Sequence, residues 1–258
     1  MAVYQDDYRI LSASKLSDTA FDFTVSCPQL AADALPGQFV HIICSPEKLL
    51  RRPISICEAS KIRGTIRLVF EQRGEGTALL SAKKAGDTLN ILGPLGKGFN
   101  ALYAYNSAIV IGGGIGVPPL LEAAKSFKGS CDAILGFRSA DAAILIDDFC
   151  EVCEDVKVTT DDGSLGTKGF VTDILRERLK TNPPDVIAAC GPTVMLKNVA
   201  ALAKMYSVDC FVSLEERMGC GVGACLVCAC RTRDENGDIK HSHVCSDGPV
   251  FNAEEVAF

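Results

Sequence analysis

The sequence lacks any excess of positive charge. Its 258 residues include 26 Lys and Arg against 32 Asp and Glu, which gives a formal net charge of −6 at pH 7. A surface that binds the phosphates of nucleic acid needs clustered basic side chains, so the composition argues against nucleic acid as a partner. The chain also lacks internal repeats, low-complexity segments and long linkers. Its length allows two domains, or two domains and a small module.

The sequence also opens without the pattern of a signal peptide, although it contains 13 cysteines. An odd number of cysteines would leave a thiol unpaired in an oxidising compartment, whereas the cytoplasm keeps thiols reduced. Together with the cysteine spacing described below, this predicts a cytoplasmic protein.

One stretch without charge, residues 101–121, is long enough to span a bilayer. It is interrupted by the glycines at 112–114 and 116 and by Pro118 and Pro119. These residues divide it into a short strand, a turn and a helix start. We therefore predict a buried strand with its following loop, and no membrane partner.

Four cysteines near the C-terminal end form the most specific motif. Cys220, Cys225 and Cys228 are spaced C-x4-C-x2-C, and Cys245 follows after sixteen further residues. This is the spacing of a plant-type [2Fe–2S] site. Zinc is the alternative, but its cysteine ligands usually come as two close pairs. Cys230 is an alternative to Cys228 as the third ligand. The C-x2-C spacing from Cys225 to Cys228 fits the loop better than the C-x4-C spacing from Cys225 to Cys230.

The residues between these cysteines are small. Gly221, Gly223 and Ala224 suit a loop whose backbone must turn sharply around a compact cluster. Such a loop can point backbone N–H groups at the sulfur atoms and stabilise their negative charge. We therefore predict a cluster-binding module over residues 209–258.

The first hundred residues predict an antiparallel barrel. Alternating or buried apolar runs at 21–25, 38–44 and 64–71 are separated by turn residues such as Pro36-Gly37. Short strands at this density are typical of a small β-barrel, which we place at residues 1–103.

After about residue 104 the pattern changes to an α/β alternation. Continuous apolar strands interspersed with helical stretches indicate a doubly wound parallel sheet covered on both faces. We place this domain at residues 104–208. The expected strands are 108–111, 133–137, 156–160 and 185–189, and the expected helices are 119–127, 170–179 and 193–205.

Two loops of this second domain are candidates for binding a dinucleotide. Gly112, Gly113, Gly114 and Gly116 follow the first strand directly. Glycines at that place let a pyrophosphate approach the backbone at a helix N-terminus, although Val117 departs from a strict G-x-G-x-x-G pattern. The turn Cys190-Gly191-Pro192 ends a later strand, at the same edge of the sheet. Its alternative interpretation is a tight turn without a ligand.

In the barrel, the run Arg52-Pro53-Ile54-Ser55 could hold a ligand, because an arginine can clamp a phosphate and a serine hydroxyl can reach a second polar atom. From chemistry alone this signal is weak, because two arginines before a proline, as at 51 and 52, more often form a solvated turn.

These motifs, in this order, resemble the ferredoxin reductase superfamily. The segment from Ser213 to Cys220, which leads into the cysteine loop, narrows the resemblance to the iron–sulfur flavoprotein family of electron-transfer subunits of dihydroorotate dehydrogenase B. The resemblance covers all three regions and implies FAD, a [2Fe–2S] cluster and NAD as cofactors. It places FAD against the residues at 52–55 and also against Val69, Phe70, Glu71, Gly76 and Thr77.

The family resemblance also implies a partner, a separate FMN-containing catalytic subunit that oxidises dihydroorotate in pyrimidine biosynthesis, in a heterotetramer with two copies of each subunit. Electrons would pass from FMN through the cluster and FAD to NAD⁺, since a flavin exchanges both single electrons and hydride. We therefore expect an oxidoreductase subunit and name no catalytic acid or base. The alternative is the flavin subunit of a ferredoxin:NADP oxidoreductase or sulfide dehydrogenase complex.

A few other residues allow two interpretations. Cys150 and Cys153 form a C-x2-C pair, which we expect to be buried as small hydrophobes in a helix. His41 could be a metal ligand, but we expect it to be an ordinary strand residue. Arg138, after the second strand of the sheet, could meet a 2′-phosphate or be a surface charge.

Overall fold

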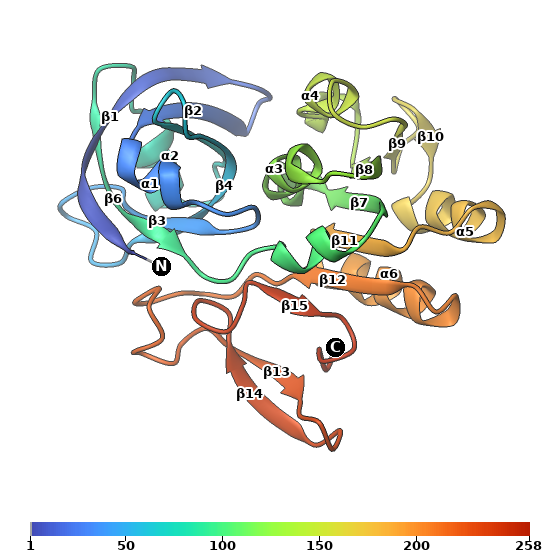
Figure 1. Ribbon diagram of the computed structural model, residues 1–258. Coiled ribbons are helices and arrows are strands. Elements are labelled where there is room, and N and C mark those ends of the chain that lie inside the picture. The colour runs from blue at the N-terminus through green and yellow to red at the C-terminus, as the bar shows by residue number, and fades with distance from the viewer. Residues whose placement is uncertain (1) are drawn as a thin grey trace.

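The structure is a computed structural model that describes residues 2–258 (Figure 1). The first part of the chain forms a closed barrel whose neighbouring strands are all antiparallel. Its strands are β1 (Tyr4–Lys15), β2 (Ala20–Ser26), β3 (Phe39–Ile43), β4 (Arg52–Ser60), β5 (Thr65–Glu71) and β6 (Thr88–Leu95). They close in the order β1-β2-β5-β4-β3-β6. The predicted antiparallel barrel is confirmed.

Alternation along the strands decides which side chains fill the barrel. On β3, Val40 and Ile42 belong to the barrel core, whereas Phe39 belongs to a separate apolar cluster beneath the cysteine segment. Successive side chains of a strand face opposite sides, so β3 presents its odd-numbered residues to the outside. Helices α1 (Pro28–Asp33) and α2 (Glu75–Ser81) add Leu30 and Leu80 to the barrel core.

The second part is a sheet in the order β10-β9-β8-β7-β11-β12-β15. Its pairings are parallel except for the last strand, which runs antiparallel to its neighbour. The bounds are β7 (Ser107–Gly113), β8 (Ser130–Phe137), β9 (Val156–Thr160), β10 (Thr167–Lys168), β11 (Val186–Cys190), β12 (Asp209–Ser213) and β15 (Val250–Asn252).

Helices cover both faces of this sheet, as Figure 1 shows. On β7, Ala108 and Val110 pack toward α3 (Pro118–Ser126) and α4 (Ile146–Cys150), whereas Ile109 and Ile111 pack toward α5 and α6 on the other face. Helix α5 spans Val171–Thr181 and helix α6 spans Thr193–Met205. Burial on both faces is why these strands are apolar along their length. Short 3₁₀ turns lie at η1 (Asn100–Ala104), η2 (Gly114–Gly116) and η3 (Ala140–Ala142).

The uncharged stretch 101–121 contains β7 and the start of α3, as expected. No helix within residues 2–258 is long and apolar enough to cross a membrane.

The last part of the chain packs against both the barrel and the parallel sheet. Strand β12 begins directly after the predicted domain boundary at residue 208, and it pairs with β11 of the parallel sheet. Strand β15 pairs with β12, so both strands extend that sheet. Between these two strands lie the cysteine loop and a hairpin of β13 (Ala229–Arg233) and β14 (Ile239–His243). Its apolar contacts reach the outer side of the barrel, where Phe39 and Leu95 pack with Cys228, Cys245 and Phe251.

Candidate functional site

The cysteine loop is organised around its sulfur atoms. The backbone N–H groups of Val222, Ala224 and Cys225 donate to Cys220 Sγ at 3.2–3.4 Å. Gly223 N–H donates to Cys245 Sγ at 3.2 Å. A positive φ of 75° at Gly221 and 80° at Gly223 lets the chain turn so that these donors converge. The predicted arrangement of small residues and inward N–H groups is therefore present.

The four thiols form two pairs. Cys228 Sγ lies 3.2 Å from Cys245 Sγ, and Cys245 N–H donates to Cys228 Sγ. Cys220 N–H donates to Cys225 Sγ at 3.3 Å. Two pairs suit a two-iron cluster, in which each iron takes two thiolates. Across residues 2–258, no three His, Cys, Asp or Glu side chains are grouped closely enough to hold one metal ion.

The loop environment changes the acidity of its thiols. Burial alone would raise the pKa of Cys220, but the N–H groups donated to its sulfur outweigh burial and lower that pKa to about 6. A thiolate is the form that binds iron. Cys230 differs, because burial raises its pKa to about 11 and its backbone is paired inside the hairpin. No hydrogen bond from the loop to Cys230 Sγ is found in the described chain, whereas each of the other four sulfurs accepts at least one.

At the start of strand β4, the neighbouring arginines Arg51 and Arg52 differ in their contacts. Arg51 is bound to the barrel, because its guanidinium donates to the backbone oxygen of His41 at 3.0 Å and to Asn90 Oδ1 at 2.7 Å. Arg52 donates only to the backbone oxygens of Leu50 and Arg51, and within residues 2–258 it has no carboxylate partner. Its charge is therefore free to meet an anion.

Arg52 lies against the start of helix α2. A Cβ added to Gly76 would lie 2.7 Å from Arg52 Nε, so a larger residue there would displace the guanidinium. Thr77 holds the turn, since its Oγ1 accepts hydrogen bonds from the N–H groups of Arg73 at 2.9 Å and Gly74 at 3.2 Å. The side chains of Val69 and Phe70 are buried in apolar clusters, so they can offer a ligand only their backbone.

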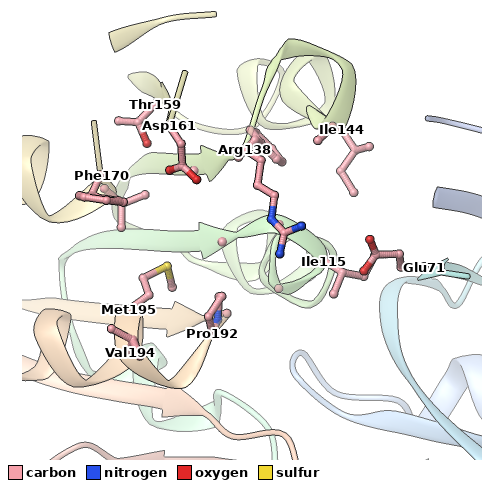
Figure 2. Close-up of a pocket in the computed structure, with 18 of the residues that line it drawn as sticks. Glu71, Ile115, Arg138, Ile144, Thr159, Asp161, Phe170, Pro192, Val194 and Met195 are labelled. Carbon is pink, nitrogen blue, oxygen red and sulfur yellow. The ribbon is translucent and has the colours of Figure 1, made fainter. Parts of the chain in front are cut away.

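A cavity of about 870 Å³ opens between the barrel and the parallel sheet (Figure 2). Gly113, Gly114, Gly116, Gly191 and Pro192 line it, as predicted from the two loops. Its wall on the barrel side includes Ser17, Thr19, Glu71 and Arg73. The cavity therefore joins strand β5 of the barrel to the two glycine-containing loops of the sheet.

Two residues of the predicted nucleotide loops do not line the cavity. Gly112 is buried under the following turn, where a Cβ would lie 2.7 Å from Val117 Cγ2. Cys190 is 2% exposed, and burial raises the pKa of its thiol to about 12. Both have a packing role, which supports a positional rather than a redox role for Cys190.

Comparison with known proteins shows which protein family the chain resembles. Residues 215–257 match the model of the iron-sulfur cluster binding domain of dihydroorotate dehydrogenase B. A dihydroorotate dehydrogenase B (NAD(+)) electron transfer subunit from Bacillus caldolyticus is 42% identical over 255 residues, 96% of each chain. The corresponding protein from Listeria monocytogenes is 40% identical over 263 residues, covering 98% of this chain and 99% of that one.

The chain belongs to this family of electron transfer subunits.

Among solved structures, an NADH-dependent reduced ferredoxin-NADP oxidoreductase that carries out flavin-based electron bifurcation superposes with a TM-score of 0.87 and 34% identity, over 96% of this chain and 89% of that one. A ferredoxin NADP⁺ reductase from Neisseria gonorrhoeae, with a TM-score of 0.63 and 17% identity over 78% and 91%, shares the fold. The family and the reductase-like fold predicted from the motifs are confirmed.

The structure adds pocket residues that the motifs did not indicate. Asp161 follows β9, Phe170 precedes α5, and Met195 lies on α6, yet all three line the cavity. Arg138, for which the sequence allowed two interpretations, lines it too, and Figure 2 shows its guanidinium directed into the pocket. No local pattern marks Asp161, Phe170 and Met195, because only the meeting of several segments at one edge of the sheet brings them together.

Glu215 is a further residue of this kind, and it lies in the segment on which the family resemblance rests. It lines the cavity, and although its side chain is exposed to that space, the surrounding walls desolvate it and raise the pKa of its carboxyl. Nearby Glu71 adds to this effect, and Arg73 opposes it.

The prediction for the C-x2-C pair was wrong. Cys150 ends α4 and is exposed, and Cys153 lies just beyond the helix and is half-buried. Helix α4 is too short to carry both residues on its buried face.

Proposed function

We propose that this chain is the electron-transfer subunit of an NAD-dependent dihydroorotate dehydrogenase. It would pass electrons from a catalytic partner subunit through a [2Fe–2S] cluster and FAD to NAD⁺. The observation that carries the proposal is the placement of three sites in one chain. Two cysteine pairs lie against the outside of the barrel, an unpaired arginine lies on the neighbouring barrel strand, and a nucleotide-sized cavity joins the barrel to the sheet.

Cys220, Cys225, Cys228 and Cys245 would hold the cluster, and Cys230 would not. When bound, the cluster supplies one-electron transfer. The chain contributes N–H donors to the sulfurs of Cys220 and Cys245, which stabilise negative charge on the thiolates.

FAD would lie on strand β4 and the start of α2. Arg52 would bind its pyrophosphate, with Gly76 leaving room and Thr77 holding the turn. Pro53 and Ser55 face the same side of β4, and Ile54 is buried in the barrel core. When bound, the flavin exchanges single electrons on one side and a hydride on the other. Val69, Phe70 and Glu71 would contribute backbone and the pocket wall.

NAD would occupy the cavity, with its pyrophosphate against the backbone at positions 113, 114 and 116. Gly191 and Pro192 would shape the nicotinamide end, and Gly112 and Cys190 would support the two loops from beneath. Hydride transfer needs position rather than proton transfer here, so we assign no catalytic acid or base.

The partner would approach the cysteine loop. Cys225 is exposed, and Val222, Leu226 and Val227 expose apolar side chains around it. Leu226 adopts a φ of 62°, which is unfavourable for a residue with a side chain and is typical of functional loops. We propose an FMN-containing catalytic subunit that oxidises dihydroorotate, two copies of each subunit in a cytoplasmic heterotetramer, and a role in pyrimidine biosynthesis. We retain 1–103, 104–208 and 209–258 as the proposed domains.

Co-purification with cofactor analysis tests the proposal. The expected complex contains one FAD and one [2Fe–2S] cluster per copy of this chain, and an FMN partner that turns over dihydroorotate with NAD⁺. The second candidate is the flavin subunit of a ferredoxin:NADP oxidoreductase, favoured by the 34% identity to the bifurcating enzyme. A partner that carries [4Fe–4S] clusters and FAD would replace the first function with the second.

A further inference from the structure

His41 lies where the barrel meets the cysteine loop. It is at the centre of β3, where its Cα is opposite Pro53 of β4. Cross-strand partners of this kind lie within side-chain contact. Since Val40 and Ile42 fill the barrel core, the His41 ring points outward, on the same side as Phe39. The ring therefore stands between the proposed flavin strand and the segment that carries the cysteines.

The ring is in direct contact with the cysteine loop. A Cβ added to Gly221 would lie 2.7 Å from His41 Nδ1, with Cε1 and Cγ of the ring at 3.3 Å. Gly221 immediately follows the proposed cluster ligand Cys220. Only a residue without a side chain leaves room for the ring at this place.

His41 is also a buried polar side chain without a hydrogen-bond partner. It is 0% exposed, and neither Nδ1 nor Nε2 makes a hydrogen bond to any of the described residues. Burial is the main cause that lowers its pKa to about 4, and the charges of Arg51 and Arg52 add to it. The backbone groups of Cys220 and Arg51 lie close enough to the ring to oppose this effect, although neither is aligned for a hydrogen bond. A neutral imidazole has one N–H to donate and one nitrogen to accept.

A buried polar group without a partner is costly, and native structures rarely contain one unless another group satisfies it. A leucine in this place would pack between β3 and the loop without that cost. A polar ring at this contact therefore points to a hydrogen-bond partner on the loop that forms only when the cluster is bound, because this loop would wrap the cluster.

We propose that His41 is a positioning residue for the [2Fe–2S] loop, and that it fixes the loop against the flavin strand and offers its N–H to the loop once the cluster is bound. This inference rests on the proposed function, since it assumes a cluster held by Cys220 and its three partners. If so, the position of the cluster relative to the flavin depends on a barrel residue that is far from the cysteines in the sequence.

Single variants of the full-length chain, purified anaerobically with FAD and cluster, test the role of the ring. His41→Leu should keep FAD but lose iron to a chelator about 10- to 100-fold faster, as for other residues that support metal ligands. It should also shift the electron paramagnetic resonance spectrum of the reduced cluster and slow cluster reduction by NADH. His41→Gln, which keeps an N–H and an acceptor, should lie close to the parent protein in all three measurements.

A double-mutant comparison tests the contact itself. Gly221→Ala forces a methyl group onto the ring and also strains the backbone at a φ of 75°, whereas His41→Ala removes the ring. Gly221→Ala should therefore speed iron release less in the His41→Ala chain than in the parent chain. Gly223→Ala is the matched control. It has a similar φ of 80°, but its Cβ would meet Ser246 at 3.1 Å instead of His41. Its effect should therefore add to that of His41→Ala.

Three results would overturn the inference. The first is a His41→Leu chain whose chelation rate, spectrum and NADH-driven cluster reduction match the parent protein. The second is loss of FAD together with the cluster, which would make His41 an ordinary barrel residue. The third is a Gly221→Ala effect that adds fully to that of His41→Ala. A parent chain that binds no iron would instead contradict the proposed function.

Discussion

Gly116 lies directly against the backbone of Cys190. A Cβ added to Gly116 would be 2.4 Å from the Cys190 carbonyl oxygen and 2.6 Å from Gly191 Cα. The two loops that line the cavity are therefore in contact through a glycine, although Gly116 and Cys190 are 74 positions apart in the sequence. Backbone atoms cannot swing away as a side chain can, so any larger residue must push the loops apart.

We expect Gly116→Ala to impair nucleotide binding more than it impairs stability. Overpacking of this kind costs about 1–3 kcal/mol. If that strain falls on the loops, KM for NADH rises by about tenfold for each 1.4 kcal/mol. Steady-state kinetics with an artificial acceptor measure it. Gly237→Ala is the control, because its φ of 84° strains the hairpin turn away from the cavity. An unchanged KM in Gly116→Ala would contradict the assignment of the loops.

Arg52→Leu should weaken FAD binding while leaving the cluster in place. A hydrogen bond to a charged group contributes about 1.5–3 kcal/mol, so the dissociation constant of FAD should rise about 10- to 100-fold. Titration of the flavin-free chain measures it. Arg63→Leu serves as a control, since Arg63 is largely exposed and contacts only Ser60 Oγ at 3.2 Å and Glu58 at 3.4 Å among the described side chains. Equal flavin affinity in the Arg52→Leu and parent chains would remove Arg52 from the site.

Cluster binding in the variants Cys225→Ser and Cys230→Ser should show which of these two cysteines is a ligand of the cluster. The first removes one thiolate from the loop and should abolish cluster binding, while NADH oxidation by FAD with an artificial acceptor persists. The second should retain iron, because Cys230 lies in the hairpin and its sulfur receives no loop N–H. Iron content and the visible spectrum decide between them. Loss of iron from the Cys230 variant would reopen the assignment of the third ligand.

Arg67 and Asp148 connect the barrel to the sheet domain, and breaking their ion pair should affect both stability and the cavity. Arg67 also donates to Asp22 Oδ2 at 2.8 Å, and it is only one-fifth exposed. We expect Asp148→Asn to lower the free energy of unfolding by about 1–3 kcal/mol and to raise KM for NADH. Urea unfolding and kinetics measure the two effects.

The control for this prediction is Asp155→Asn, because Asp155 pairs with Lys157 at the surface, with both side chains about half exposed. Such pairs contribute about 0–1 kcal/mol. If the two variants unfold alike, Asp148 does not hold the domains together.

Elements with a continuous local pattern were predicted well. The helix expected at 193–205 and the strand expected at 156–160 have these bounds in the structure. Both follow from side-chain periodicity within one segment, which needs no knowledge of distant residues. The short helix α4 was predicted less well, and with it the exposure of Cys150. In so short a helix, packing against neighbours decides which side is covered.

The sequence by itself determined the kind of chemistry: the cysteine spacing, the glycine loop and the barrel arginine carry the family resemblance, because metal and phosphate binding require fixed residue types at fixed local spacings. Tertiary structure alone decided what these motifs meet. It places Asp161, Arg138 and Glu71 around one cavity, extends the sheet through β12 and β15, and buries His41 against Gly221. Such contacts join segments that are distant in the chain, and no local pattern records them.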